Sequence, residues 1–157
     1  MELPVETDQT IRRHYFHPRY TNMSWQAALV WGQVPAKREK VRWLNFYGPR
    51  DTIPGVSYYQ VLEPGSLPTN FFAGKAVFVG EAPMITYQGA KGFDNHPTPH
   101  TRWTGQQLAG VELQATAFLN LIRREWLEEL SALAELGWAT LVGVFRWRSD
   151  ASRHSVQ

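Results

Sequence analysis

The sequence predicts an α/β domain with a mixed or parallel central sheet, flanking helices and an apolar helix near its C-terminus. Residues 76–79 form a continuously apolar run that stops at Gly80, the pattern of a strand buried on both faces. Residues 110–124 carry apolar side chains at helical spacing, and residues 130–145 are almost wholly apolar. The length of 157 residues suits one domain.

The first half of the chain is divided into short elements by Gly and Pro. Residues 11–16 predict a short strand, and Asn22 predicts the cap of a helix that ends before Gly32. Residues 41–46 alternate apolar and polar side chains, which predicts a half-buried strand. Ser57 can cap a single helical turn.

The second half begins with a long irregular stretch. Residues 80–109 show little periodicity and predict a loop, and loops of that length are usually functional or disordered. A helix is then expected to open at Gly110, with one apolar stripe formed by Val111, Ala115, Phe118 and Ile122. Residues 126–145 predict a second helix, and residues 149–157 a polar tail.

Composition excludes several classes of protein. Sixteen Lys and Arg against 14 Asp and Glu leave a formal charge of +2, and the arginines are scattered, so no nucleic-acid partner is expected. The chain has no Cys, which excludes disulfides and zinc–thiolate sites. Its start is acidic and lacks the pattern of a signal peptide. As a helix, residues 130–145 would reach only about 24 Å, short of a hydrocarbon layer of about 30 Å.

One functional site follows from the expected order of elements. Ligands bind beyond the carboxyl ends of parallel strands, and the stretch from Gly80 to Asp94 would run from such an end toward the start of the helix at Gly110. A small anionic ligand or a partner surface is expected there. The histidines His14 and His17 flank a strand end and are expected at the surface.

A metal site is the competing interpretation of the same region. Asp94, His96 and His100 are ligand types for zinc or manganese, which would make the chain a small soluble metal-dependent enzyme. Pro97 and Pro99 prevent the two histidines from sharing one helical face, so this is the alternative and not the first choice.

Several sequence blocks follow one another in a recognisable order: residues 6–13, 43–49, 57–58, 61–62, 74–80, Asp94, Thr98-Pro99 and 110–115. In this order they resemble the C-terminal portion of the type-2 CHASE domain, the extracellular sensory domain of bacterial transmembrane receptors. Two positions depart from the family pattern, because Ala109 stands where Pro is expected and Gln114 where His is expected.

The resemblance implies a function and an organisation. Residues 1–128 would be a partial sensory domain, residues 129–148 a short apolar helix left from a membrane segment, and residues 149–157 a polar tail. We expect a truncated sensor that binds an unknown small-molecule ligand outside the cytoplasmic membrane and is attached to the membrane through adjacent helices. Its signal would pass to a cytoplasmic cyclase, kinase or diguanylate cyclase that this chain lacks.

The site residues expected from the resemblance lie in the loop and at the helix start. No catalytic residue, metal or cofactor is assigned. The residues expected to face ligand are Gly80, Glu81, Asp94, Thr98, Gly110 and Glu112.

Overall fold

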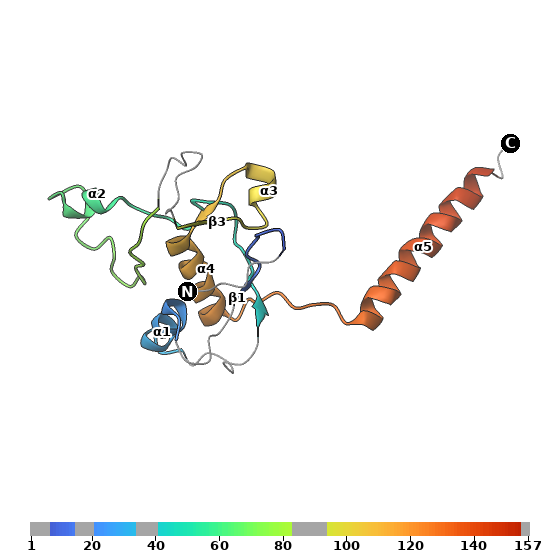
Figure 1. Ribbon diagram of the computed structural model, residues 1–157, viewed down its shortest axis with the longest axis horizontal. Coiled ribbons are helices and arrows are strands. Elements are labelled where there is room, and N and C mark those ends of the chain that lie inside the picture. Colours follow the sequence, from blue (N-terminus) through green and yellow to red (C-terminus); the bar gives the residue numbers. More distant parts are fainter. Residues whose placement is uncertain (1–6, 15–20, 34–40, 83–93, 155–157) are drawn as a thin grey trace. The chain divides into compact units, whose positions relative to one another are not determined.

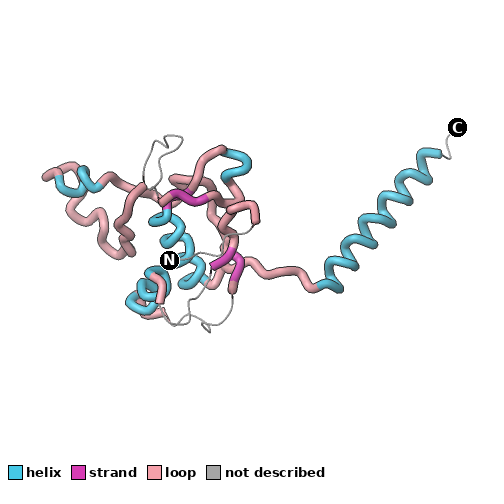
Figure 2. Tube along the Cα trace, in the orientation of Figure 1, coloured by secondary structure: helices cyan, strands magenta, loops and turns pink. Residues whose placement is uncertain are grey.

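The structure is a computed structural model that describes residues 7–14, 21–33, 41–82 and 94–154. The chain forms two units, Met1–Leu127 and Glu128–Gln157. Helices and short strands alternate with long irregular connections (Figures 1 and 2). The elements described are β1 (Arg13–His14), α1 (Met23–Val30), β2 (Arg42–Trp43), α2 (Tyr58–Leu62), β3 (Asn95–His96), α3 (Thr101–Thr104), β4 (Leu108–Ala109), α4 (Gly110–Arg123) and α5 (Ala132–His154).

The described strands form two small antiparallel sheets. β1 pairs with β2, with Arg13 opposite Trp43, and β3 pairs with β4, with Asn95 opposite Ala109. The prediction of a mixed or parallel central sheet is therefore wrong. The predicted mixture of helices and strands is confirmed. The apolar run at residues 76–79 is not part of any described strand or sheet.

Residues 76–79 are not the buried strand that their composition predicts. Val77 and Val79 are 54% and 73% exposed, and only the Phe78 side chain is partly covered. A doubly buried strand needs a hydrogen-bonded neighbour at its edge and a packed layer on each face. This run has α4 on one side, where the Phe78 and Phe118 rings are 5.3 Å apart, and no described strand beside it.

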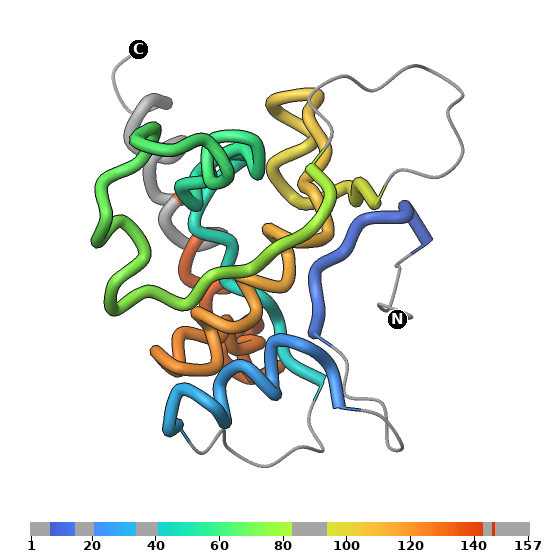
Figure 3. Tube along the Cα trace, turned by 90° about the vertical axis from the view of Figure 1, so that its left-hand side faces the viewer, coloured from blue at the N-terminus to red at the C-terminus, as the bar shows by residue number. Residues whose placement is uncertain are grey.

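Helix α4 is the centre of the first unit, and its start at Gly110 confirms the sequence prediction. Two neighbouring faces of α4 are buried, which is why its apolar surface is broader than the predicted stripe. Leu113 and Ala117 belong to a core cluster with Ile11, Leu44 and Leu108. Phe118 and Leu121 belong to a second cluster with Trp25 and Ala28 of α1, which lies beside α4 (Figure 3).

The shorter predicted helices are confirmed, and the predicted strands are shorter than expected. Asn22 caps α1, because its Oδ1 accepts a hydrogen bond from the Trp25 amide at 3.0 Å. Ser57 precedes α2, and its amide donates to Gln60 Oε1 at 3.0 Å. Only residues 13–14 and 42–43 are paired as strands, and residues 15–16 lie outside the described residues.

The predicted loop at residues 80–109 contains regular structure. Its second half holds β3, α3 and β4, so the prediction of a continuous loop is wrong there. Two-residue strands bury too little apolar surface to leave an alternating pattern in the sequence. Residues 83–93 lie outside the described part of the chain.

The second unit contains α5, which begins after Ser131. The Ser131 hydroxyl accepts a hydrogen bond from the Ala134 amide at 3.3 Å. The helix runs to His154, into the predicted polar tail, and so includes Arg146, Arg148 and Asp150. The predicted apolar helix at residues 129–148 is therefore not what the structure shows. Among the described residues, no helix combines the length and the apolar character needed to cross a membrane.

His14 is buried, against the expectation that it lies at the surface. Its side chain is on the core side of β1 at 2% exposure, and its Nε2 accepts a hydrogen bond from Asn22 Nδ2 at 2.8 Å. The Ser24 hydroxyl lies 3.2 Å from the same nitrogen. His14 thus joins β1 to the cap of α1, while His17 is outside the described residues.

Candidate functional site

A hollow of about 300 Å³ lies at the N-terminal end of α4, and we refer to it as the α4 hollow. It brings together residues that are far apart in sequence, from α1, from the irregular run after residue 78, from the β3 region and from α4. Apolar and polar side chains share its wall, as in sites for small polar molecules. It is lined by Met23, Val79, Gly80, Asp94, His96, Gly110, Val111 and Gln114.

Asp94 lies directly at the start of α4. The Gly110 amide donates a hydrogen bond to the Asp94 carbonyl oxygen at 2.7 Å, next to the β3–β4 pair. This contact confirms the predicted approach of the Asp94 segment to the helix at Gly110. The negative charge of the carboxylate is favourable at the N-terminus of a helix, where the helix dipole is positive.

Glycine at position 110 is required by this arrangement. A Cβ atom at Gly110 would overlap the Asp94 carboxylate. Gly80 is constrained in the same way on the other wall, because a Cβ there would come 2.7 Å from the Val111 Cβ. Both glycines therefore permit a close approach that a side chain would block, of Asp94 to the start of α4 and of residue 80 to Val111.

A polar pair is formed by Asp94 and His96. The His96 Nε2 lies 2.7 Å from Asp94 Oδ1, and the Asp94 side chain remains 60% exposed. Asp94 Oδ2 can therefore accept a further hydrogen bond from a bound molecule. The pair offers hydrogen-bond acceptors beside the apolar surfaces of Met23, Val79 and Val111.

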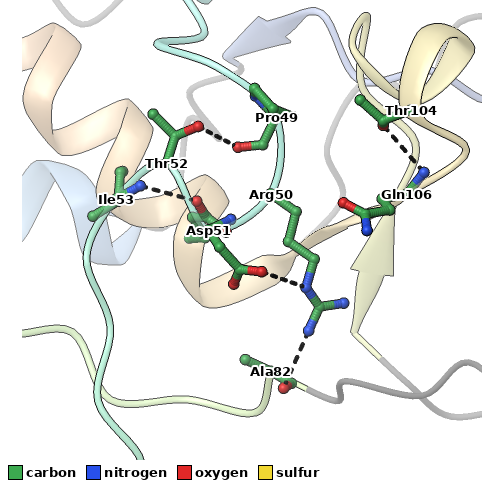
Figure 4. Close-up of polar contacts among 9 residues, drawn as sticks. Pro49, Arg50, Asp51, Thr52, Ile53, Ala82, Thr104 and Gln106 are labelled. Atoms are coloured by element: carbon green, nitrogen blue, oxygen red, sulfur yellow. Dashed lines mark hydrogen bonds and ion pairs between the residues drawn. The ribbon is translucent and has the colours of Figure 1, made fainter.

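Glu112 lies at the predicted helix start but has a different partner. Its two carboxylate oxygens accept hydrogen bonds from the Asp51 amide at 3.2 Å and the Ile53 amide at 3.3 Å. The same turn includes Arg50, which donates to the Ala82 carbonyl at 3.3 Å (Figure 4). Glu112 therefore holds the loop at residues 49–53 against α4 and does not line the hollow.

Thr98 and Glu81 also lie outside the lining of the hollow. Thr98 is buried at 4% exposure, and its amide donates to the Thr101 hydroxyl at 2.9 Å, which organises the start of α3. Glu81 is exposed and follows the lining residue Gly80. Of the expected site residues, Gly80, Asp94 and Gly110 come together in the hollow.

Five lining residues were not among the expected ligand-facing set, and one of them, His96, was named only in the metal-site alternative. The five are Met23, Val79, His96, Val111 and Gln114. Gln114 is one helical turn after Gly110, and that spacing places both on one face of α4, a signal present in the sequence. It is also the position where the family pattern has His. The sequence contains no signal for Met23, because this residue lines the hollow only as a result of the packing of α1 on α4.

The metal-site alternative gains no support. His100 packs edge-on against the Phe46 ring, with ring centroids 6.5 Å apart, and it does not line the hollow with Asp94 and His96. Within residues 7–14, 21–33, 41–82 and 94–154, no group of three or more metal-ligating side chains is close enough to hold an ion.

Comparison with known proteins supports the resemblance seen in the sequence. The CHASE2 domain model matches residues 1–146, which is most of the chain. No curated protein and no solved structure matches the chain. CHASE2 domains are extracytoplasmic sensory domains of bacterial signalling receptors. The match covers well over half of the sequence and includes the segments that form the α4 hollow, and the chain therefore belongs to the CHASE2 domain family.

Proposed function

We propose that the chain senses a small molecule by binding it in the α4 hollow. The single observation that carries this proposal is the position of the Asp94–His96 pair at the start of α4, in a hollow with apolar walls. The hollow is of the size that small ligands occupy, and Asp94, His96 and Gln114 supply polar groups among its apolar lining. No catalytic residue is assigned, in keeping with a family of sensory domains.

The chemistry of the hollow favours a neutral or cationic ligand with hydrogen-bond donors. A bare helix N-terminus attracts anions, which was the basis for expecting a small anionic ligand. In the structure the Asp94 carboxylate lies beside that terminus, at Gly110. A second negative charge would be repelled by Asp94, whereas an ammonium, amide or hydroxyl group can donate to it.

Binding would act by shifting a conformational equilibrium. Asp94 and His96 belong to the β3 segment, while Val111 and Gln114 belong to α4, so one ligand contacts both sides of the hollow. A ligand that binds one arrangement of β3 and α4 more tightly increases its population. We propose that this shift passes to membrane-attached helices and then to a cytoplasmic cyclase, kinase or diguanylate cyclase in the full receptor, with this chain as the C-terminal portion of the sensory domain.

A thermal-shift screen of the purified chain tests the proposal. The probes are small primary amines, amides and polyols, with carboxylates and phosphates of similar size as the comparison set. We expect donors, and not anions, to raise the melting temperature; at 100 times Kd the stabilisation is about 2.7 kcal/mol. Asp94→Asn should abolish the shift, and Glu63→Gln, an exposed charge outside the hollow, should preserve it. A shift that is produced by the anions, or that survives Asp94→Asn, contradicts the proposal.

A further inference from the structure

Residues 75–81, which we call the Val77 segment, have strand-like alternation on the surface of the first unit. Phe78 and Gly80 face α4, since the Phe78 ring lies 5.3 Å from the Phe118 ring and a Cβ on Gly80 would contact Val111. Val77 and Val79 are exposed on the other side. The segment runs across α4 (Figure 3), and none of the strands that the structure describes pairs with it.

The backbone of this segment is available for pairing. In the part of the chain that the structure describes, no backbone amide or carbonyl of residues 76–81 makes a hydrogen bond to another residue. An apolar segment with an open backbone edge is the kind of surface to which another extended strand adds. The exposed Val77 and Val79 would gain cross-strand side-chain neighbours from such an addition.

The charges at the two ends of the Val77 segment indicate which strand could pair with it. Lys75 and Glu81 are equally distant in sequence from Phe78, and both side chains are exposed. The Lys75 ammonium lies 4.4 Å from the centre of the Phe71 ring, a contact that still leaves it open to a carboxylate. We propose that the Val77 segment pairs antiparallel with the same segment of a second copy of the chain, with Phe78 on the two-fold axis.

This register satisfies both charge and hydrophobic pattern. Antiparallel pairing about Phe78 sets Lys75 opposite Glu81 of the other copy and Val77 opposite Val79, on one face. Two ion pairs then flank a cluster of four valines. A parallel in-register pair would instead place Lys75 opposite Lys75 and Glu81 opposite Glu81. An antiparallel pair centred on a residue other than Phe78 would no longer place Lys75 opposite Glu81. The contact is self-complementary and closes at two copies.

The dimer would also border the α4 hollow, because Val79 and Gly80 belong both to the Val77 segment and to the hollow lining. The proposal does not depend on ligand binding, since it rests on the pairing pattern alone. It names a self-association surface in addition to the sensing site.

Charge reversal tests the dimer on the full chain by sedimentation equilibrium. We expect wild-type dimers, and each of Lys75→Glu and Glu81→Lys should weaken dimerisation by about tenfold, because each single change makes two like-charge pairs per dimer. The double swap should restore the wild-type constant. Arg102→Glu, an exposed charge reversal outside the segment, is the control. A wild-type monomer at about 1 mM, or a double swap no better than the single changes, overturns the proposal.

Disulfide trapping tests the register. The chain has no Cys, so introduced thiols report without background. A mixture of Val77→Cys and Val79→Cys chains should cross-link rapidly as a heterodimer, because these positions are directly opposed. Each variant alone should cross-link slowly, since its thiols lie on a diagonal beyond disulfide reach. Equal rates in all three samples would show that the proposed register is wrong.

Discussion

The Asn120 side chain binds the backbone of Asn45 as a neighbouring strand would. Asn120 Oδ1 accepts from the Asn45 amide at 2.8 Å, and Asn120 Nδ2 donates to the Asn45 carbonyl at 2.9 Å. The same Nδ2 also donates to the Thr116 carbonyl of α4 at 3.0 Å. Asn120 is fully buried, so these bonds attach the segment after β2 to α4 in the absence of water.

Removing this amide should destabilise the first unit. Asn120→Ala leaves the Asn45 amide and carbonyl without their side-chain partner, and we expect a loss of about 2–3 kcal/mol in the free energy of unfolding. Urea unfolding followed by tryptophan fluorescence measures this value. Gln26→Ala, on the exposed side of α1, should change it by less than about 0.5 kcal/mol. An Asn120→Ala variant as stable as this control would show that the bonds contribute little.

His14 should make stability depend on pH. Burial, and secondarily the positive charge of Arg42, lower the pKa of His14 to about 4 from its usual 6.5. Between these values the unfolded chain binds the proton and the folded chain does not, so stability falls as the pH decreases from about 6.5 to about 4 and then levels off. The total contribution is at most about 3 kcal/mol.

The difference between wild type and His14→Gln isolates this contribution from that of the carboxylates. Unfolding free energies of both proteins should be measured across the same pH range. We expect the gap between them to narrow or reverse as the pH falls toward 4, because only the wild type has the buried imidazole. A gap that is constant with pH would mean that His14 titrates alike in the folded and unfolded chains.

Gly110→Ala should alter the hollow by displacing Asp94. The added methyl group overlaps the carboxylate, so the Asp94 side chain must move away from the start of α4. We expect loss of ligand-induced thermal shift with retained helix content by circular dichroism. Gly137→Ala is the matched control: it places the same methyl in α5, where a Cβ meets nothing within 4 Å. Equal ligand-induced thermal shifts in the two variants would show that Asp94 is not part of the ligand site.

Glu112 should protect two loop amides from exchange with solvent. Each carboxylate oxygen accepts one amide, from Asp51 and from Ile53. Glu112→Gln retains one acceptor oxygen and Glu112→Ala retains none. Hydrogen exchange at residues 51 and 53 should therefore accelerate modestly in the first variant and most in the second. Identical exchange in both variants and wild type would contradict the assigned role of Glu112.

Local patterns in the sequence predicted α1, α2 and α4, but not α3, which lies in the predicted loop, or the bounds of α5. The spacing of Val111, Ala115 and Phe118 predicts α4 because its burial follows helical periodicity along one segment. Asn22 and Ser57 predict helix starts because a cap acts over a few residues. The approach of Asp94 to Gly110 was also expected, and with it the core of the candidate site.

Features that depend on distant partners were missed. The apolar run at residues 76–79 indicates burial, but the sequence does not show which surface would bury it. Within the described part of the chain, no surface covers these residues fully. His14 looked like a surface residue because its burial depends on Asn22 and Ser24. Glu112 was expected to face ligand, since nothing near it in sequence indicates the amides of residues 51 and 53.

The central claim is that small donor molecules bind at the start of α4, and nuclear magnetic resonance of the labelled full chain tests it most directly. Primary amines, amides and polyols should be titrated while the amide signals are followed. The account predicts that shifts concentrate at Gly80, Gly110, Val111 and Gln114 and vanish in Asp94→Asn. Shifts that concentrate elsewhere on the chain, or none at all, would contradict it.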